Sequence, residues 1–253
     1  MALRFDEAWM VATLMLWIRL AALLALSPIV TAAKVPVTFV VLLSLAFAGL
    51  IAAGLGLRYA GVVNLPTLAV GALLEVGIGA LLGFALRCAF ASFSLAGQLV
   101  DVQMGLGIGA LYDPVSQSNS PVLGTSLALF GVALFFAVDG HHALLRGVAY
   151  SATVLPPGQA WPALTVAGLL RPFGAMFTAG VSVVAPVVFV LLLTELALGV
   201  ISRALPQMNV FFVGMPAKIL VGLLALALTA ASIGPAMSAT YAGIFRFWDE
   251  VLR

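Results

Sequence analysis

We expect this chain to fold as an all-α integral membrane protein, because its composition is strongly apolar and its patterning is helical. Of its 253 residues, 64% are hydrophobic and 8% are charged, whereas a soluble domain is about 45–50% apolar and about 25% charged. The mean hydropathy is +1.22. The alternating pattern of a β-barrel is absent, and backbone polar groups in lipid must be satisfied within helices. These observations exclude a disordered chain and an ordinary cytosolic enzyme.

The charge balance and the cysteine count exclude two further classes. Eleven Lys and Arg residues stand against nine Asp and Glu residues, which gives a net charge of +2. That is too little for a basic patch on phosphate backbones, so we expect no nucleic-acid partner. Cys88 is the only cysteine, and therefore the sequence has no disulfide framework.

Six apolar runs are long enough to form membrane helices, which need about 20 residues each. In chain order they are Ala8–Ile29, Val37–Leu57, Leu65–Phe93, Pro121–Val138, Ala163–Ile201 and Val210–Ile233. We expect the first to be a retained helix and not a signal peptide, because Asp6 and Glu7 dilute the basic start and Arg19 interrupts the apolar core. Short segments rich in Pro, Gly or polar residues separate the runs. No linker is long enough to divide two domains, so we expect a single domain over residues 1–253.

Ionisable residues within or beside these runs are the most informative feature of the sequence. They are Arg19, Glu75, Arg87, Asp101, Asp139, Arg171, Glu195 and Lys218. A charge at the bilayer centre costs at least about 2.5–3.5 kcal/mol, so helices that carry several should face protein, water or a lumen. Arg58, Arg87 and Arg203 suit helix ends, where long side chains reach the interface. Arg19 and Glu75 suit such a place poorly, since apolar residues flank both.

Two other patterns bear on how the helices pack. Lys and Arg occur at almost every junction instead of on one side, so the sequence does not predict a simple serpentine topology. Gly79 and Gly83 form a G-x-x-x-G pair, which lets helix backbones approach closely. The pair predicts either assembly with partner helices or ordinary packing within the chain, and the sequence leaves both open.

The segment from residue 94 to residue 121 combines a polar helix face with an apolar glycine-rich stretch. Ser94, Gln98 and Asp101 are spaced by four and three residues, so they share one face of a helix. The stretch that follows, residues 104–114, has three glycines at alternate positions, each costing about 1 kcal/mol in a helix. It lacks the Lys of a phosphate loop. We therefore expect a loop that either connects two packed helices or fills and seals a pore.

Both histidines follow Asp139, which we expect to be the N-cap of a helix running through Ala152. Asp139, His142 and Arg146 are then close enough to hydrogen-bond to one another. Adjacent helical residues lie about 100° apart, so we expect His141 and His142 not to converge on one ion. H-E-x-x-H and G-x-S-x-G motifs are missing. We therefore expect no metal site, no cofactor and no enzymatic activity.

Three segments carry a family resemblance. They are GQLVDVQMGLGIGALYDP (residues 97–114), DGHHALLR (139–146) and GVISRALPQMNVFFVGMPAKILV (199–221). In order and spacing, the chain resembles the FliR/SctT family of type III secretion export proteins over essentially its whole length. The Gly-His-His helix and the Val-Gly-Met-Pro turn look more like flagellar FliR than like injectisome SctT proteins, which share the Pro-Gln-Met-Asn loop.

The resemblance implies an architecture of bent helical hairpins packed into a helical hetero-oligomer. Residues 1–160 would pack like a FliP subunit and residues 161–253 like a FliQ hairpin. With FliP-like and FliQ-like subunits, the chain would form the gate through which unfolded flagellar proteins cross the bacterial inner membrane. It would be required for flagellum assembly and lie in lipid within the flagellar basal body, partly projecting toward the periplasm. The same assembly would explain charges that lipid alone would reject.

The resemblance also assigns candidate site residues. The channel plug would comprise Met104, Gly105, Leu106, Gly107, Ile108, Gly109, Leu111, Tyr112, Asp113 and Pro114. A loop facing an FlhB-like subunit would comprise Pro206, Gln207, Met208 and Asn209. Candidates for buried or interfacial charges are Arg19, Glu75, Asp101, Asp139, His142, Arg146, Glu195 and Arg203.

Two other functions remain open from the residues alone. A small-solute transporter would use carboxylates such as Glu75, Asp101 and Glu195 as ion or proton relays. Such transporters often carry inverted repeats, and none is evident in the sequence. An intramembrane enzyme is a weaker alternative, because the catalytic motifs are missing.

Overall fold

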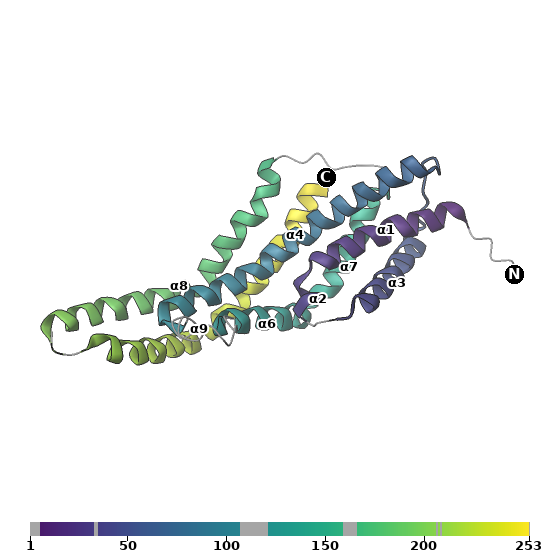
Figure 1. Cartoon of the computed structure of the whole chain (residues 1–253). Helices are drawn as coiled ribbons and strands as arrows, with labels where there is room; N and C mark the ends of the chain where they lie inside the picture. The colour runs from purple at the N-terminus through teal and green to yellow at the C-terminus, as the bar shows by residue number, and fades with distance from the viewer. Residues whose placement is uncertain are drawn as a thin grey trace, which may run out of the picture. The chain divides into compact units, whose positions relative to one another are not determined.

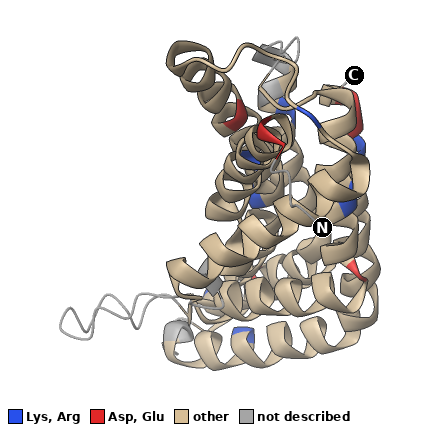
Figure 2. Cartoon of the chain, turned by 90° about the vertical axis from the view of Figure 1, so that its right-hand side faces the viewer, with Lys and Arg blue, Asp and Glu red and all other residues tan. Residues whose placement is uncertain are grey.

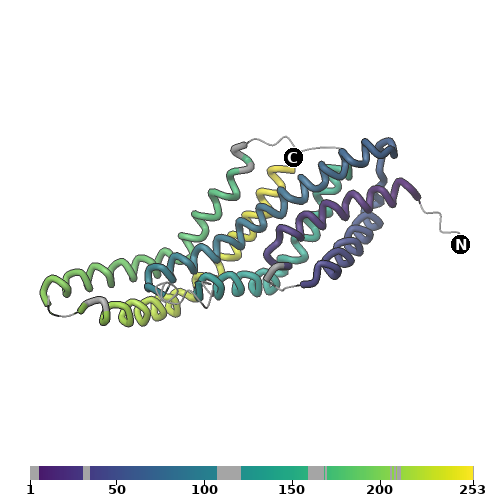
Figure 3. The backbone as a smooth tube through the Cα atoms, viewed as in Figure 1, coloured from purple at the N-terminus to yellow at the C-terminus, as the bar shows by residue number. Residues whose placement is uncertain are grey.

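The computed structural model describes residues 6–32, 35–106, 121–158, 166–205, 207 and 209–252, and in these ranges the chain is helical without β-strands. Figures 1 and 3 follow the helices along the backbone. They are α1 (Glu7–Leu26), α2 (Pro28–Ala32), α3 (Val37–Leu55), α4 (Leu65–Met104), α6 (Val122–Ala137), α7 (Gly140–Val154), α8 (Val166–Ala204) and α9 (Val210–Leu252). The predicted all-α class is confirmed.

Five of these helices are long and apolar enough to cross a membrane. The pair α6 and α7, which meets at a bend of 71°, adds a sixth span if it is counted as one broken helix. The predicted runs therefore correspond to helices, but three helices are much longer than a single crossing requires. At about 1.5 Å per residue, the 40 residues of α4 extend about 60 Å, against a hydrocarbon core of about 30 Å.

Two helices extend beyond the apolar runs that predicted them, and for α4 the polar face at Ser94, Gln98 and Asp101 had indicated such an extension. Helix α4 continues past Phe93 to Met104 because Ala96, Val100 and Met104 are buried at a spacing of four residues, which extends its apolar face beside the polar one. Helix α9 continues past Ile233 to Leu252 and contains Pro235. Proline removes one backbone donor, and apolar membrane helices tolerate that loss.

The helix termini follow local signals. Asp6 Oδ1 accepts a hydrogen bond from the Ala8 amide at 3.2 Å and caps α1. Asn64 Oδ1 accepts one from the Thr67 amide at 2.9 Å before α4. Gly56, with φ of 61°, ends α3 in the left-handed conformation that glycine adopts without strain.

The chain forms two compact units. Unit 1 comprises Met1–Cys88, Phe136–Phe173 and Ala242–Arg253, and unit 2 comprises Ala89–Phe135 and Gly174–Tyr241. The boundaries fall inside α4, α6, α8 and α9. This division by packing differs from the expected FliP-like and FliQ-like parts, which meet at residue 160 and stay a prediction.

Unit 1 is held together by close packing of α1 on α4 and on α3. A Cβ atom added to Gly79 would overlap the carbonyl oxygen of Arg19, and one added to Gly83 would lie 2.8 Å from that of Leu23. The backbones of α1 and α4 therefore touch where the glycines lie. Of the two readings of the G-x-x-x-G pair, packing within the chain is the one the structure shows. On the side of α3, Trp17 Nε1 donates to Ser44 Oγ at 3.0 Å.

Unit 2 has an aromatic core. Phe90, Phe93 and Phe135 surround the ring of Tyr241, with ring centroids 5.3–5.5 Å from it. The Tyr241 hydroxyl donates to the carbonyl oxygen of Gly131 at 2.6 Å, so this buried hydroxyl group has a hydrogen-bond partner.

Much of the apolar surface stays outside these cores. In the most apolar windows of α3, α8 and α9, only 17% of the residues are buried within the chain. Charged residues are few in Figure 2, where most of the ribbon is tan. These helices therefore present apolar faces that suit lipid or other protein chains.

Candidate functional site

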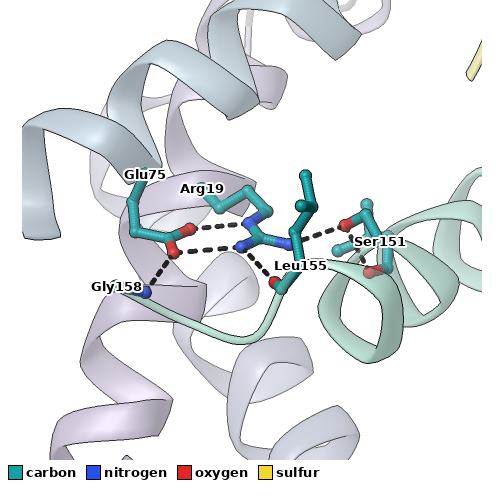
Figure 4. A network of polar contacts seen from close by, with 6 residues as sticks. Arg19, Glu75, Ser151, Leu155 and Gly158 are labelled. Carbon is teal, nitrogen blue, oxygen red and sulfur yellow. Dashed lines mark hydrogen bonds and ion pairs between the residues drawn. The ribbon is translucent and has the colours of Figure 1, made fainter. Parts of the chain in front are cut away.

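Arg19 and Glu75 form a fully buried ion pair in unit 1 (Figure 4). Arg19 Nε donates to Glu75 Oε2 at 2.6 Å, and Arg19 Nη2 donates to Glu75 Oε1 at 3.0 Å. The side chains are 0% and 1% exposed. This two-point geometry is the strong arrangement of a guanidinium with a carboxylate.

The rest of the pair's hydrogen-bonding capacity is used by α7 and the turn after it (Figure 4). Arg19 Nη1 donates to Ser151 Oγ at 3.0 Å, and Arg19 Nη2 donates to the Leu155 carbonyl at 2.9 Å. The Gly158 amide donates to Glu75 Oε1 at 2.7 Å. A buried ion pair is tolerated when its remaining donors and acceptors are satisfied. The network therefore explains how two charges persist in apolar helices and ties α1, α4 and α7 together.

The sequence identified the two charges but not their partners. We expected helices with such charges to face protein, water or a lumen, and Arg19 and Glu75 do face protein, since they contact each other inside the chain. The structure also adds Ser151, Leu155 and Gly158 to the site. Two of these contribute backbone groups, which have no signature in the sequence.

Asp101 has a different role, at the start of α6. Its Oδ1 accepts from the Leu123 amide at 3.2 Å and its Oδ2 from the Gly124 amide at 3.0 Å. The residue is 3% exposed. Amides in the first turn of a helix have no partner within the helix, and the helix dipole favours a negative charge there. Asp101 thus caps α6 from the last turns of α4, within unit 2.

The start of the predicted plug lies beside this cap. Met104 is completely buried at the end of α4, where a Cβ atom on Gly222 of α9 would overlap its side chain. Gly105 follows with φ of 79°, a left-handed conformation that ends the helix. Leu106 is partly buried. The remaining predicted plug residues, Gly107–Pro114, lie outside the described residues.

A second feature of unit 2 is a cavity of about 480 Å³ beside the end of α4. It is lined by residues that include Met104, Gly105, Glu195 and Lys218. Lys218 Nζ lies 3.0 Å from Glu195 Oε1. The side chain of Glu195 is 57% exposed, so this pair is solvated and contributes little stability by itself.

The other candidate charges and the candidate loop lie at the surface of the isolated chain. Arg146, Arg203, Gln207 and Asn209 are exposed, whereas Pro206 and Met208 lie outside the described residues. Exposure leaves these side chains accessible to a partner. The assignment of an interface to them stays a prediction.

Asp139 is the N-cap of α7, as expected, although its side chain does not bond to a backbone amide in the first turn of the helix. The residue has φ of 57° and ψ of 27°, and its side chain makes no capping hydrogen bond. In this left-handed conformation its Oδ1 lies 3.4 Å from His142 Nδ1 instead. The expected contact between Asp139 and His142 is therefore present, whereas among the described residues no hydrogen bond or ion pair joins Arg146 to either of them.

The two histidines, which we expected not to converge on one ion, have their rings side by side. The ring centroids of His141 and His142 are 4.1 Å apart. One potential ligand atom from each of Asp139, His141 and His142 lies within 4.8 Å of the other two. Helical side chains lean toward the N-terminal end of the helix, so in a first turn both rings can approach the residue that precedes it.

Comparison with known proteins identifies the family. The sequence model of the family described as bacterial export proteins, family 1, matches residues 10–243. The chain belongs to this family. The resemblance inferred from three short segments is thus confirmed over nearly the whole sequence.

Individual relatives agree with this assignment. The flagellar biosynthetic protein FliR of Bacillus subtilis (strain 168) is 35% identical over 156 residues, which cover 60% of each chain. FliR of Escherichia coli (strain K12) is 32% identical over 184 residues, covering 70% of this chain and 69% of its own. The surface presentation of antigens protein SpaR of Shigella sonnei is 30% identical over 149 residues, covering 59% of this chain and 58% of its own. Membership of the export-apparatus family, together with five membrane-length apolar helices, makes the chain a membrane protein.

Proposed function

We propose that the chain is the FliR-type subunit of a flagellar type III export gate. With FliP-like and FliQ-like subunits it forms the channel that carries unfolded flagellar proteins across the bacterial inner membrane, in the flagellar basal body. It acts as a conduit, without bond chemistry or a cofactor. The observation that carries the proposal is the family match over residues 10–243.

The exposed apolar helices support a role among other subunits. Helices α4, α8 and α9 have 40, 39 and 43 residues, roughly twice the length of one membrane crossing. In the most apolar windows of α8 and α9 only 17% of the residues are buried within the chain, so neighbouring subunits can cover the rest. Such an assembly suits a protein that projects partly toward the periplasm, with residues 1–160 packed like FliP and residues 161–253 like FliQ.

In this assembly we assign the plug to residues 104–114, on the family resemblance. Support comes from both flanks of the segment. Gly105 ends α4 with a left-handed turn, and Asp101 fixes the first turn of α6. A segment anchored at both ends can be displaced without losing its resting position.

The loop at residues 206–209 is assigned to an FlhB-like partner. It joins α8 to α9, and Gln207 and Asn209 are exposed. The exposed charges Arg146, Glu195 and Arg203 are assigned to subunit interfaces on the same ground.

An injectisome export subunit is the second candidate, because SpaR is among the relatives. A stand-alone transporter is less favoured by the geometry. Its candidate relay carboxylates are engaged: Glu75 by Arg19, Asp101 by two backbone amides, and Glu195 by Lys218.

Deletion of the encoding gene tests the function directly. Loss of flagella and of secreted flagellar subunits, with co-purification of FliP-like and FliQ-like proteins, is the expected result. Normal motility with loss of virulence-type secretion would assign the injectisome role instead. A chain that is stable alone and leaves both secretion phenotypes unchanged would overturn the proposal.

Deletion of Gly105–Tyr112 tests the plug. We expect greater ion leakage through the assembled gate, because the apolar seal is removed. Leakage is measured from the membrane potential of cells that carry the complex. A variant of unchanged length, with Leu106, Ile108, Leu111 and Tyr112 each replaced by Ser, separates the seal from the connector. Unchanged leakage in both variants with intact assembly would refute the plug.

A further inference from the structure

Both histidines of the chain lie at one break in the helical structure. Helix α6 ends at Ala137 and α7 begins at Gly140, with Asp139 between them. Imidazole nitrogens and a carboxylate are thereby placed in four consecutive positions, Asp139 to His142. None of these side chains belongs to the buried Arg19 network or to the predicted plug.

The spacing of the three side chains fits a metal ion. One ligand atom from each of Asp139, His141 and His142 lies within 4.8 Å of the others. The Asp139 Oδ1 to His142 Nδ1 distance is 3.4 Å, and two ligands about 2.1 Å from a tetrahedral ion are about 3.4 Å apart. The side chains of Asp139 and His142 are 74% and 62% exposed. Exposed side chains can change rotamer, and such changes at Asp139 and His142 can shorten the distances to the third ligand atom.

Two further observations point to a ligand here. Among the described residues, Nδ1 of His141 is one of the buried side-chain atoms that lack a hydrogen-bond partner, and a buried polar atom without a partner calls for one. Its ring packs between those of Phe136 and His142, with centroids 5.4 Å and 4.1 Å away. Asp139 is the residue other than glycine with a positive φ in the described part of the chain. Such backbone strain is concentrated at functional sites.

We propose that Asp139, His141 and His142 bind one divalent transition-metal ion of the zinc class. Imidazole and carboxylate ligands suit Zn²⁺, Ni²⁺ and Cu²⁺ better than Mg²⁺ or Ca²⁺. Three protein ligands leave a fourth position for water or for a group from another chain. The ion ties the first turn of α7 to the residue that precedes it. This proposal does not rest on the export function.

The simpler interpretation is an exposed pair between Asp139 and His142 at positions i and i+3. Such a pair contributes about 0–1 kcal/mol. It leaves the buried nitrogen of His141 without a role, whereas a metal site uses all three residues. The two interpretations therefore differ in what they predict for His141.

The test uses the full chain in its purified complex, carrying an affinity tag without histidines. After dialysis against a chelator, Zn²⁺ is titrated and bound zinc is counted by elemental analysis. We expect one equivalent per chain and at least about a tenfold loss of affinity in His141→Ala and in His142→Ala, since each removes a ligand. Thr153→Ala is the matched control, because it changes an exposed polar side chain of the same helix and should leave zinc binding unchanged.

A second variant separates binding from folding. Asp139→Gly removes the carboxylate and also relieves the positive φ, which glycine adopts without strain. Its complex should assemble normally and bind zinc at least about tenfold more weakly. Protection of the wild-type histidines from diethyl pyrocarbonate by Zn²⁺ requires no variant. The proposal is overturned by absent stoichiometric binding, by undiminished binding in the His141→Ala variant, or by absent protection.

Discussion

At the scale of single residues, the molecule shows how an apolar chain keeps charges. The buried charges of Arg19 and Glu75 are tolerated because the pair also forms hydrogen bonds to its surroundings. These bonds go to the Ser151 hydroxyl, the Leu155 carbonyl and the Gly158 amide. A buried pair of this kind adds little net stability relative to apolar residues, but removal of one member leaves the other charge unpaired.

Arg19→Ala and Glu75→Gln should therefore destabilise the fold strongly. We expect a loss of about 3–5 kcal/mol in the free energy of unfolding for each, because one buried charged or polar group is left unsatisfied. The measurement is the unfolding of the solubilised chain in its complex. Arg58→Ala is the control, since the Arg58–Asp6 pair is exposed and should contribute at most about 1 kcal/mol.

The double variant Arg19→Met with Glu75→Leu sharpens this prediction. An apolar pair of similar volume removes both charges together, so part of the lost stability should return. If Arg19→Ala proves as mild as Arg58→Ala, the network does not hold α1, α4 and α7 together.

Asp101→Asn tests the cap on α6. Asparagine keeps the shape but turns one acceptor into a donor that faces a backbone amide, which costs about 1–3 kcal/mol locally. Hydrogen exchange at the Leu123 and Gly124 amides should accelerate by about 5- to 150-fold. Ser94→Ala, on the same helix, should leave these amides unchanged, and equal exchange in both variants would contradict the cap.

At this scale, the sequence identified the buried charged residues but did not predict which groups they contact. Arg19 and Glu75 stood out because apolar residues surround them, and Asp101 because it shares a helix face with Ser94 and Gln98. Their partners were not predictable, because most are backbone groups far away in the sequence. Asp139 was correctly predicted as the N-cap of α7, but its left-handed conformation and the lack of a side-chain capping bond were not predicted.

At the scale of elements, the apolar runs predicted which segments are helices better than where those helices end. Hydropathy detects the part of a helix that is apolar on all sides, so the apolar runs end before the last turns of α4 and α9, although the spacing of Ser94, Gln98 and Asp101 did indicate a helix beyond Phe93. The last turns of α4 are stabilised by one buried apolar face, which is formed by Ala96, Val100 and Met104. The G-x-x-x-G pair indicated close helix packing, but only the structure identifies α1 as the partner.

Gly79→Ala should disrupt that packing. The added Cβ would overlap the carbonyl oxygen of Arg19, and overpacking of this kind costs about 1–3 kcal/mol. Gly54→Ala in α3 is the control, because nothing lies within 4 Å of its added Cβ and alanine favours a helix by about 1 kcal/mol. Thermal unfolding should therefore move in opposite directions, and parallel shifts would refute contact between the α1 and α4 backbones.

At the scale of the whole molecule, the sequence predicted the membrane class and the family, and both are confirmed. It did not predict the two compact units, because each unit collects residues from several helices that are distant in the sequence. The sequence also did not show which apolar side chains are buried inside the chain and which remain on its surface. Patterning within one chain cannot distinguish faces covered by lipid from faces covered by another subunit, since both are apolar.

Substitutions on the exposed apolar faces address that distinction. Leu196 in α8 and Leu228 in α9 are 68% and 76% exposed. We expect Leu196→Asn and Leu228→Asn to reduce the amount of FliP-like and FliQ-like protein that co-purifies, with the chain itself retained in the membrane. Ser202→Asn exchanges one exposed polar residue of α8 for another and serves as the control. Equal yields of complex in all three would assign these faces to lipid.

The Arg19 network has a consequence for biosynthesis. Glu75 follows Arg19 by 56 residues, and the Leu155 carbonyl follows it by 136. At about 5–20 residues per second, the ribosome reaches Glu75 roughly 3–11 s after Arg19, and Leu155 roughly 7–27 s after it. During that interval the first helix holds an unpaired guanidinium, at a cost of at least about 2.5–3.5 kcal/mol in the bilayer centre. Arg19 can therefore reach its buried, fully paired state only after α4 and the end of α7 have emerged.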